Sequence, residues 1–363
     1  MHLQLLIPGL VWPEAMASCP QLPSLEILLA RGRRARSVAT DGTAWLYAAH
    51  DVTPAEATRA TGAAGTNGPI RASDTEQRDW PAAPFSLLAD GGAPDGACWI
   101  CADPVHLRLQ RDALLLADAS LLGLRREEAD ALVASLNAHF AVDGFELQVL
   151  HPDRWYAKLQ AVPELATTPL ALAAGQSVDP NLPRGADAAI WHARMNEVQM
   201  LLHNHPVNEA REARNQMPVN SLWFWGAGAL PVRDEDSPVP FSHVWATDLL
   251  ARGLGLWSGA LALDVPPSAS ILLESAPATG VGLVVLDGLE AARAYGDIGA
   301  WESRLREIES VWLAPLVTAL REERIGMLSV HGFGDDKAFS VEAVRHDLKR
   351  FWRLAKPWHL RLG

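Results

Sequence analysis

The chain has 363 residues, of which 49% are hydrophobic and 20% are charged, and its formal net charge is −12. This length permits a large buried core in one elaborated domain or in two. The acidic balance argues against a general affinity for nucleic-acid phosphates, and the sequence has no apolar run of about 18 residues that would span a bilayer. We therefore expect a soluble, cytoplasmic protein that binds neither nucleic acid nor membranes.

Two local features have structural explanations. The basic cluster Arg31–Arg36 is short and has the composition of a solvated helix end, where positive charge is favourable. Three cysteines cannot all pair within the chain, which fits a reducing compartment. Cys98 and Cys101 have CxxC spacing, but on a strand they would point to opposite faces, so we expect buried structural thiols.

The first part of the chain alternates strand and helix patterns. The pattern predicts a strand over residues 2–11, a helix from Leu22 to Arg33 that ends near Gly32, and a short strand from Ala35 to Thr40. From Thr53 to about Gly96 the composition is typical of loops, with a helix around Ser86–Ala89. We read this part as the start of a larger α/β domain.

The middle of the chain has a different texture. One amphipathic helix is predicted over residues 125–139. Strands are predicted over residues 97–102, 105–110, 113–117, 145–150 and 155–160. This order indicates a small α+β unit inserted into the larger domain. We place the inserted cap at residues 95–185 and the discontinuous core at residues 1–94 and 186–363.

The last part returns to alternation. Helices are predicted over residues 188–202, 246–253 and 299–322, and strands over 221–225, 281–286 and 326–329. Alternation at this spacing favours a mainly parallel sheet covered by helices. The stretch from His203 to Gly228 is the main functional pointer, because an apolar strand that ends in Gly226 and Gly228 is typical of a strand that delivers a loop to a ligand site.

Several collinear segments carry a family resemblance. They are His205-Pro-Val-Asn208, Pro218-Val-Asn220, Trp223-Phe-Trp-Gly-Ala-Gly228, Ser242-His-Val-Trp-Ala-Thr-Asp248 and Gly296-Asp297. In these segments the chain resembles the archaeal-type cofactor-independent phosphoglycerate mutases of the alkaline phosphatase superfamily, and most closely their bacterial relatives known as RpfE-type regulatory proteins. The resemblance implies an alkaline-phosphatase-like three-layer α/β/α core with a smaller inserted α+β cap.

The resemblance also implies a site with two divalent metals and a nucleophilic serine. In phosphoryl transfer one metal activates the attacking oxygen, and both metals neutralise the charge that builds on the phosphoryl group. Here several of the implied positions differ. Pro8 stands where the first metal-binding Asp is expected, Ala294 stands where a His is expected, and Thr43 aligns roughly with the nucleophile. Glu290 and His331 are the metal ligands that remain, as vestiges of the site.

Two hypotheses follow. The first is a non-catalytic regulatory or anion-binding protein without a cofactor, which uses the retained cleft for a small phosphorylated or carboxylate ligand. Its expected ligand contacts are Asn208, Arg211, Arg214, Asn220, Trp225, Gly226 and Gly228. The second is a metal-dependent phosphoesterase or phosphomutase, in which Thr43, Glu290, His331 and nearby aspartates hold Mn, Zn or Co in a rearranged site. The sequence names no protein partner.

Overall fold

The computed structural model describes residues 1–12, 19–35, 41–52, 80–110, 113–118, 121–234, 236–334 and 337–361. The contacts divide the chain into two compact units, one made from Met1–Asp51 with Glu235–Gly363 and the other from Val52–Asp234. These boundaries differ from the expected cap at residues 95–185, because the second unit also takes in segments on both sides of it. None of the helices in the described residues is long and apolar enough to cross a membrane.

The first unit is built on a seven-stranded sheet with the order β2-β12-β11-β1-β10-β8-β9. Its strands are β1 (His2–Ile7), β2 (Arg33–Ala35), β8 (His243–Trp245), β9 (Leu261–Leu263), β10 (Val281–Val285), β11 (Met327–Phe333) and β12 (Ala338–Ala343). β1 pairs in parallel with β10 and β11, and β8 pairs in parallel with β10 and β9. β12 and β2 complete the sheet as antiparallel strands at one edge.

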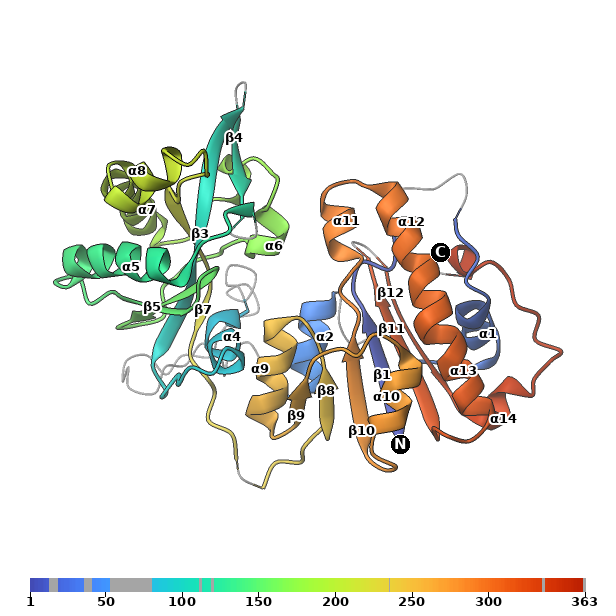
Figure 1. Ribbon diagram of the computed structural model, residues 1–363. Coiled ribbons are helices and arrows are strands. Elements are labelled where there is room, and N and C mark those ends of the chain that lie inside the picture. Colours follow the sequence, from blue (N-terminus) through green and yellow to red (C-terminus); the bar gives the residue numbers. More distant parts are fainter. Residues whose placement is uncertain are drawn as a thin grey trace. The chain divides into compact units, whose positions relative to one another are not determined.

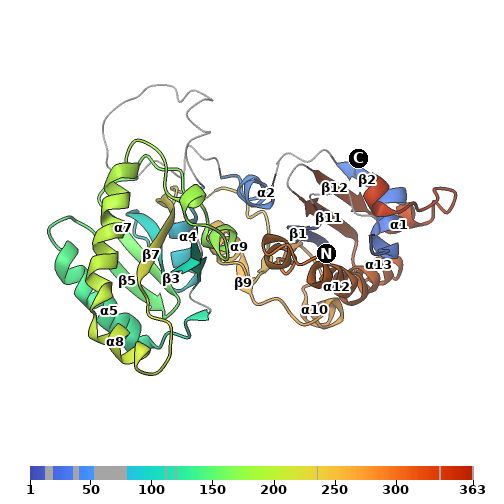
Figure 2. The ribbon, with the colours of Figure 1, turned by 90° about the horizontal axis from the view of Figure 1, so that it is seen from above.

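Helices cover both faces of this sheet. α1 (Pro23–Arg31), α10 (Ala269–Ser275), α12 (Ile298–Glu307), a π-helical turn (Ile308–Leu313), α13 (Ala314–Arg321) and α14 (Arg345–Leu348) contribute to one side. α2 (Gly42–Ala49) packs against α9 (Leu249–Ser258), which contacts β8 and β9. Figure 2 shows α10, α12 and α13 on one side of the strands and α2 on the other. α11 (Glu290–Ala294) and a final 3₁₀ turn (Trp358–Arg361) complete the unit.

Alternation along β1 explains the layers. Leu3, Leu5 and Ile7 are fully buried in the core cluster that includes α1, α12 and α13, whereas Gln4 points to the opposite face. The sheet is thus buried on both sides, which is usual for parallel strands. The expected α/β class with an alkaline-phosphatase-like three-layer core is confirmed (Figure 1).

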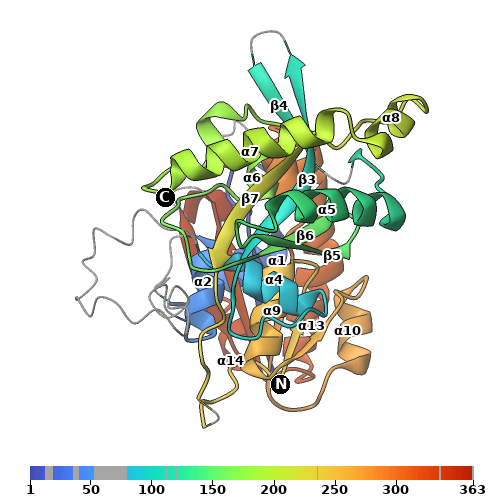
Figure 3. The ribbon, with the colours of Figure 1, turned by 90° about the vertical axis from the view of Figure 1, so that its left-hand side faces the viewer.

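The second unit contains an antiparallel sheet formed by β3 (Cys98–Gln110), β4 (Ala113–Ala117), β5 (Glu146–His151), β6 (Arg154–Leu159) and β7 (Ser221–Gly228). Its helices are α4 (Ala82–Ala89), α5 (Arg126–Phe140), α6 (Leu170–Ala173), a 3₁₀ turn (Asp179–Asn181), α7 (Ala188–His203) and α8 (Pro206–Glu212). α5 and α7 lie across one face of the sheet (Figure 3), and α4 contacts β3 and β7. This is the expected α+β arrangement.

Three sequence predictions need correction here. Residues 221–225 do form a strand, but β7 pairs antiparallel with β3 and does not belong to the parallel core sheet. The two strands predicted over residues 97–102 and 105–110 form a single strand, β3. Pro104 does not interrupt it, because at this position β3 pairs only with β7. The pairing with β6 ends at Cys101, and the pairing with β4 begins at His106. The predicted strand over Ala35–Thr40 begins at Arg33, and residues 36–40 lie outside the described residues.

Candidate functional site

The carboxyl ends of the parallel strands in the first unit meet at one edge of the sheet. β1 is followed by Pro8 and Gly9, β10 is followed by Asp287, and β8 is followed by Asp248. The backbone of Glu290 passes close to this point, since a Cβ on Gly9 would lie 3.3 Å from the Glu290 nitrogen. Open α/β sheets bind ligands outside the carboxyl ends of their strands, so this edge is the first place to look for a site.

The start of α2 lies at the same edge. Asp41 caps the helix, its Oδ1 accepting a hydrogen bond of 2.8 Å from the Ala44 N–H. Gly42 is buried, and a Cβ there would contact the Pro8 ring at 3.4 Å. Thr43 follows in the first turn of α2 and is exposed. The start of α2 thus packs on Pro8 through Gly42, and Thr43 is the next residue of the chain.

We call Asp41, Asp248, Asp287 and Glu290 the acidic edge, because the charges of the three aspartates all act on Glu290. Desolvation by burial raises the pKa of Asp248 to about 6, and the charge of Asp287 adds to this shift. Glu290 is exposed as a residue, yet its carboxylate lies in a crowded neighbourhood. Desolvation, followed by the charges of Asp248 and Asp287, raises its pKa to about 7. Burial and the neighbouring carboxylates thus outweigh the charge of Arg293, which acts on Glu290 in the opposite direction.

The acidic edge fits a binuclear metal centre poorly. Asp41 and Asp248 each use one carboxylate oxygen to cap a helix. Asp41 accepts a hydrogen bond from the Ala44 N–H, and Asp248 accepts one of 2.8 Å from the Ala251 N–H. Pro8 has no ligand atom, and Ala294 at the end of α11 has none in its side chain. Across the described residues, no group of three or more His, Cys, Asp or Glu side chains has an arrangement that would hold a metal ion. The residues present do not reproduce the ligand set that the resemblance implies.

His331 lies in β11 and is 7% exposed. Its Nδ1 is 2.8 Å from Ser340 Oγ, its Nε2 is 3.1 Å from Gln4 Oε1, and the Trp45 ring packs on it at 4.4 Å. Burial lowers its pKa to about 4, so the imidazole is neutral near pH 7. The residues whose charges act on Glu290 do not include His331. His331 thus uses both ring nitrogens in internal contacts, which supports a structural role.

The two asparagines expected to contact a ligand hold backbone instead. Asn208 is 2% exposed, and its amide donates to the Leu202 and Val219 carbonyls while its oxygen accepts from the Val219 N–H. Asn220 makes a matched pair of bonds with the N–H and carbonyl of Leu107. An amide with its donors and acceptor satisfied in this way fixes a loop. Their ligand-binding role stays a prediction that these contacts do not support.

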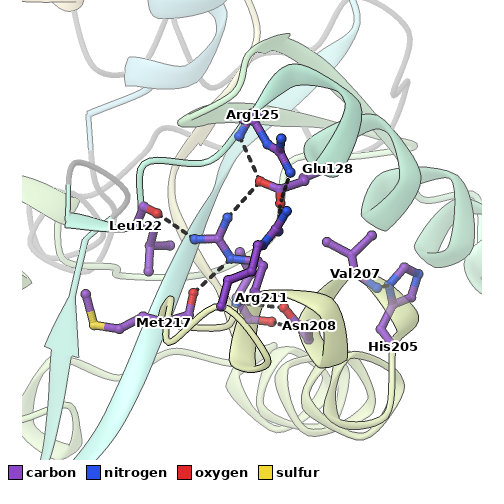
Figure 4. A network of polar contacts seen from close by, with 10 residues as sticks. Leu122, Arg125, Glu128, His205, Val207, Asn208, Arg211 and Met217 are labelled. Carbon is purple, nitrogen blue, oxygen red and sulfur yellow. Dashed lines mark hydrogen bonds and ion pairs between the residues drawn. The ribbon is translucent and has the colours of Figure 1, made fainter.

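Arg211 meets the Glu128 carboxylate from another helix (Figure 4). Arg211 is completely buried, and its guanidinium donates to Glu128 at 2.7 Å, to the Leu122 carbonyl at 2.5 Å and to the Met217 carbonyl at 2.9 Å. Arg214 donates to the same Glu128 at 2.6 Å. This network joins α8 to the start of α5, and it leaves Arg211 with no surface to offer a ligand.

The glycine-rich end of β7 is also packed internally. Trp225 donates from Nε1 to Asp103 Oδ2 at 2.7 Å. Gly226 has φ +66°, and a Cβ there would lie 2.9 Å from the Cβ of Ala82 in α4. Gly228 pairs with Trp99 in the sheet. The glycine at 226 is therefore explained by close packing against a helix, and the expected loop at the edge of the core sheet is wrong because β7 belongs to the other sheet.

Asp248 and Asp287 were not predicted from the sequence as members of a site. Asp248 lies three residues after the end of β8 and Asp287 lies two residues after the end of β10, and this position was the available signal. Asp103 was not predicted either, and burial raises its pKa to about 7. That carboxylate sits inside β3 with Trp225 as its partner, and a single Asp beside a proline gives no sequence signal of this kind.

No protein-family profile matches the chain. Among curated proteins, the chain is 28% identical over 172 residues to a 2,3-bisphosphoglycerate-independent phosphoglycerate mutase of Methanothrix thermoacetophila, covering 44% of this chain and 40% of that protein. It is 29% identical over 168 residues to a probable enzyme of the same name from Geobacter sulfurreducens, with the same coverage. The match to the Methanosarcina mazei protein of that name is 24% identical and covers 63% of this chain and 62% of that one. The matched part thus spans about two fifths of the length of the first two relatives.

Among solved structures, the PH0037 protein from Pyrococcus horikoshii is similar with a TM-score of 0.54 and 13% identity, over 94% of this chain and 87% of that one. A cofactor-independent phosphoglycerate mutase from Thermoplasma acidophilum is 16% identical, with a TM-score of 0.48 over 100% of this chain and 95% of that one. The curated relatives agree with the resemblance to cofactor-independent phosphoglycerate mutases. Membership of the RpfE-type group stays a prediction.

Proposed function

We propose that this chain is a non-catalytic, regulatory descendant of a phosphoglycerate mutase scaffold of the RpfE type. The observation that carries the proposal is His331, which is 7% exposed and has both ring nitrogens within hydrogen-bond distance of Ser340 and Gln4. A histidine that ligates a metal needs one ring nitrogen free for the ion. Pro8 and Ala294, which replace ligands that the resemblance implies, support the same conclusion.

A second candidate function has its own supporting observation. The acidic edge holds carboxylates with raised pKa values, and the exposed residue Thr43 follows two positions after Asp41 in the first turn of α2. Carboxylate oxygens are good ligands for hard divalent cations, and a bound cation would relieve their mutual repulsion. A phosphoesterase or phosphomutase would then use Thr43 as its nucleophile. The first proposal is preferred because two of the carboxylates already cap helices, which restricts their freedom to converge on an ion.

Metal titration separates the two candidates. Isothermal titration with Mn²⁺, Zn²⁺ and Co²⁺ should give at most weak binding to the full chain, and Asp287→Asn with Glu290→Gln should abolish what there is. The non-catalytic proposal requires that no metal binds tightly at two sites per chain. Two tight sites that both disappear in the double variant would favour the phosphoryl-transfer candidate. Glu274→Gln with Glu322→Gln, which removes two exposed carboxylates from α10 and from the end of α13, is the matched charge control.

A further inference from the structure

The exposed tryptophan and phenylalanine side chains of this protein lie at one point. All fourteen tryptophans and all eight phenylalanines are among the described residues, and only Trp352 and Phe351 of these are exposed. Their exposed fractions are 66% and 74%, and that of the neighbouring Leu354 is 75%. The two rings contact each other edge to face, with their centroids 5.4 Å apart. Every other Trp or Phe side chain is at least partly buried, so this pair marks a surface of a different kind.

The pair belongs to residues 349–357, which we call the aromatic loop and which is fixed at both ends. α14 ends at Leu348, which is 6% exposed, and the last 3₁₀ turn begins at Trp358, which is 2% exposed. Both are part of the core of the first unit, and Trp358 donates from Nε1 to the Pro20 carbonyl at 3.0 Å. Between these anchors each residue from 351 to 357 is exposed, and Figure 1 shows the chain after α14 standing away from the neighbouring helices. The loop therefore projects its side chains from a fixed base.

The aromatic loop is also a basic segment in an acidic chain. It holds four of the 31 Lys and Arg residues and none of the 43 Asp and Glu residues, whereas the whole chain has a net charge of −12. Arg350 pairs with Asp347 of α14 at 2.9 Å. Within the described part of the chain, the side chains of Lys349, Arg353 and Lys356 make no ion pair or hydrogen bond. Three cations of the loop are therefore available to an outside group, beside the two exposed rings.

This combination of side chains suits the surface of a lipid bilayer. Tryptophan is amphipathic and sits at the level of the lipid headgroups, while Lys and Arg can bury their stems and keep their charges among the phosphates. Basic residues beside a bilayer are attracted by anionic lipids. The aromatic residues at the centre of a protein–protein interface lie in well-packed pockets ringed by contacts that exclude water, whereas here they stand on a projecting loop in which every residue from 351 to 357 is exposed. The projecting shape therefore favours a bilayer over an acidic protein.

We propose that the aromatic loop docks this protein on the surface of a bilayer that contains anionic phospholipids. Phe351 and Trp352 enter the headgroup layer, and the three available cations of the loop bind the lipid phosphates. The contact is peripheral and reversible, because a single loop buries little apolar surface. The proposal does not depend on whether the acidic edge is catalytic.

The sequence analysis expected no membrane binding, because it considered the charge of the whole chain. Charges interact over a Debye length of about 8 Å at physiological ionic strength. The carboxylates elsewhere on the protein are therefore largely screened from a bilayer that the loop touches. The local charge of the loop, and not the net charge of −12, decides the attraction.

The test uses the full chain and two variants of the loop. Co-sedimentation measures binding to vesicles of phosphatidylglycerol mixed with phosphatidylcholine, and to vesicles of phosphatidylcholine alone. Fluorescence anisotropy measures binding to labelled polyglutamate and to a labelled single-stranded oligonucleotide, which represent an acidic protein and a nucleic acid. The aromatic variant is Phe351→Ser with Trp352→Ser. The charge variant is Lys349→Gln with Arg353→Gln and Lys356→Gln.

Each variant has a matched control. Ile190→Ser with Met200→Ser removes two apolar side chains of α7 that are 55% and 77% exposed. Arg108→Gln with Arg304→Gln and Arg306→Gln removes three exposed charges from β3 and α12. Thermal unfolding checks that all four variants are folded.

The wild type should bind the phosphatidylglycerol vesicles and bind the phosphatidylcholine vesicles much less. Both loop variants should weaken that binding about 10-fold or more, because the cations attract the loop and the rings insert it, and both controls should bind as the wild type does. The proposal is overturned if the wild type does not bind phosphatidylglycerol vesicles, if either loop variant binds them as the wild type does, or if a control loses as much as its matched variant. Tighter binding of polyglutamate or of the oligonucleotide, lost in the charge variant, would assign the loop to an acidic protein or a nucleic acid and would also overturn the proposal.

Discussion

Arg211→Met tests whether the Arg211 network stabilises the second unit or is kept for a ligand. The change preserves much of the side-chain volume but removes the guanidinium from Glu128, and it leaves the Leu122 and Met217 carbonyls without that donor. Removal of one partner of a buried ion pair costs about 3–5 kcal/mol. Because Glu128 keeps two other arginine partners, we expect a loss near the lower limit, about 3 kcal/mol in the free energy of unfolding.

Urea unfolding followed by tryptophan fluorescence measures this loss. Arg126→Met is the matched control, because Arg126 pairs with Asp130 on the same helix and both side chains are about half exposed (52% and 51%). An exposed pair of this kind contributes only about 0.2–1 kcal/mol. Amide hydrogen exchange in α5 and α8 should rise in Arg211→Met and remain unchanged in the control, since the network joins these two helices.

The pH dependence gives a second readout. Desolvation alone would raise the pKa of Glu128, but hydrogen bonds from Arg125 and Arg214 and the charge of Arg211 outweigh it and lower the pKa to about 2. The ordinary value is 4.5, so the stabilisation is full above that pH and is lost as the pH falls through 2. The difference between wild type and Arg211→Met should therefore shrink in acid. A variant no less stable than Arg126→Met at pH 7 would refute the structural role and return Arg211 to the ligand hypothesis.

Three further predictions concern single residues. Burial lowers the pKa of His331 from 6.5 to about 4, so the first unit should lose stability as the pH falls from 6.5 toward 4, and His331→Gln should reduce this slope in unfolding measured across that range. Burial raises the pKa of Asp103 from 3.8 to about 7, so the contribution of this group to the stability of the second unit is full below pH 4 and is lost as the pH rises to 7. Asp103→Asn should abolish that loss, and an unchanged slope between pH 4 and 7 would contradict the assignment. Gly226→Ala should destabilise the second unit by about 1–2 kcal/mol because of its positive φ and the nearby Cβ of Ala82, whereas Gly288→Ala, with nothing within 4 Å of its new Cβ, should be neutral in the same thermal assay.

Local signals in the sequence predicted much of the fold. α1 begins one residue after the predicted start at Leu22 and ends at Arg31, where Gly32 caps it, and the amphipathic pattern of α5 gave its position within one residue at each end. These elements depend on capping and periodicity, which are contained in the segment itself. The segment itself does not determine which other strand it pairs with. The apolar run of β7 has the composition of a buried parallel strand, and only its long-range pairing with β3 decides that it lies in an antiparallel sheet.

The candidate sites were harder to predict, because residue type alone does not distinguish a ligand contact from an internal one. Asn208 and Arg211 have the chemistry of anion-binding residues, yet their partners are backbone groups and a glutamate 83 positions away from Arg211. The basic cluster at Arg31–Arg36 has the composition of a solvated helix end, and its residue types alone do not show which other segments lie beside it. Two of its arginines line a pocket with Arg350 and Arg353, which come from the far end of the sequence.

The most direct test of the central claim is an assay of phosphoglycerate mutase turnover together with bound metal per chain, after dialysis against Mn²⁺, Zn²⁺ or Co²⁺. Loss of direct ligands should weaken a metal site by more than the roughly 10- to 100-fold that follows loss of a supporting contact. We therefore predict no turnover above that of Thr43→Ala and fewer than two tightly held metals. Two metals per chain, with turnover that Thr43→Ala abolishes, would contradict the non-catalytic account.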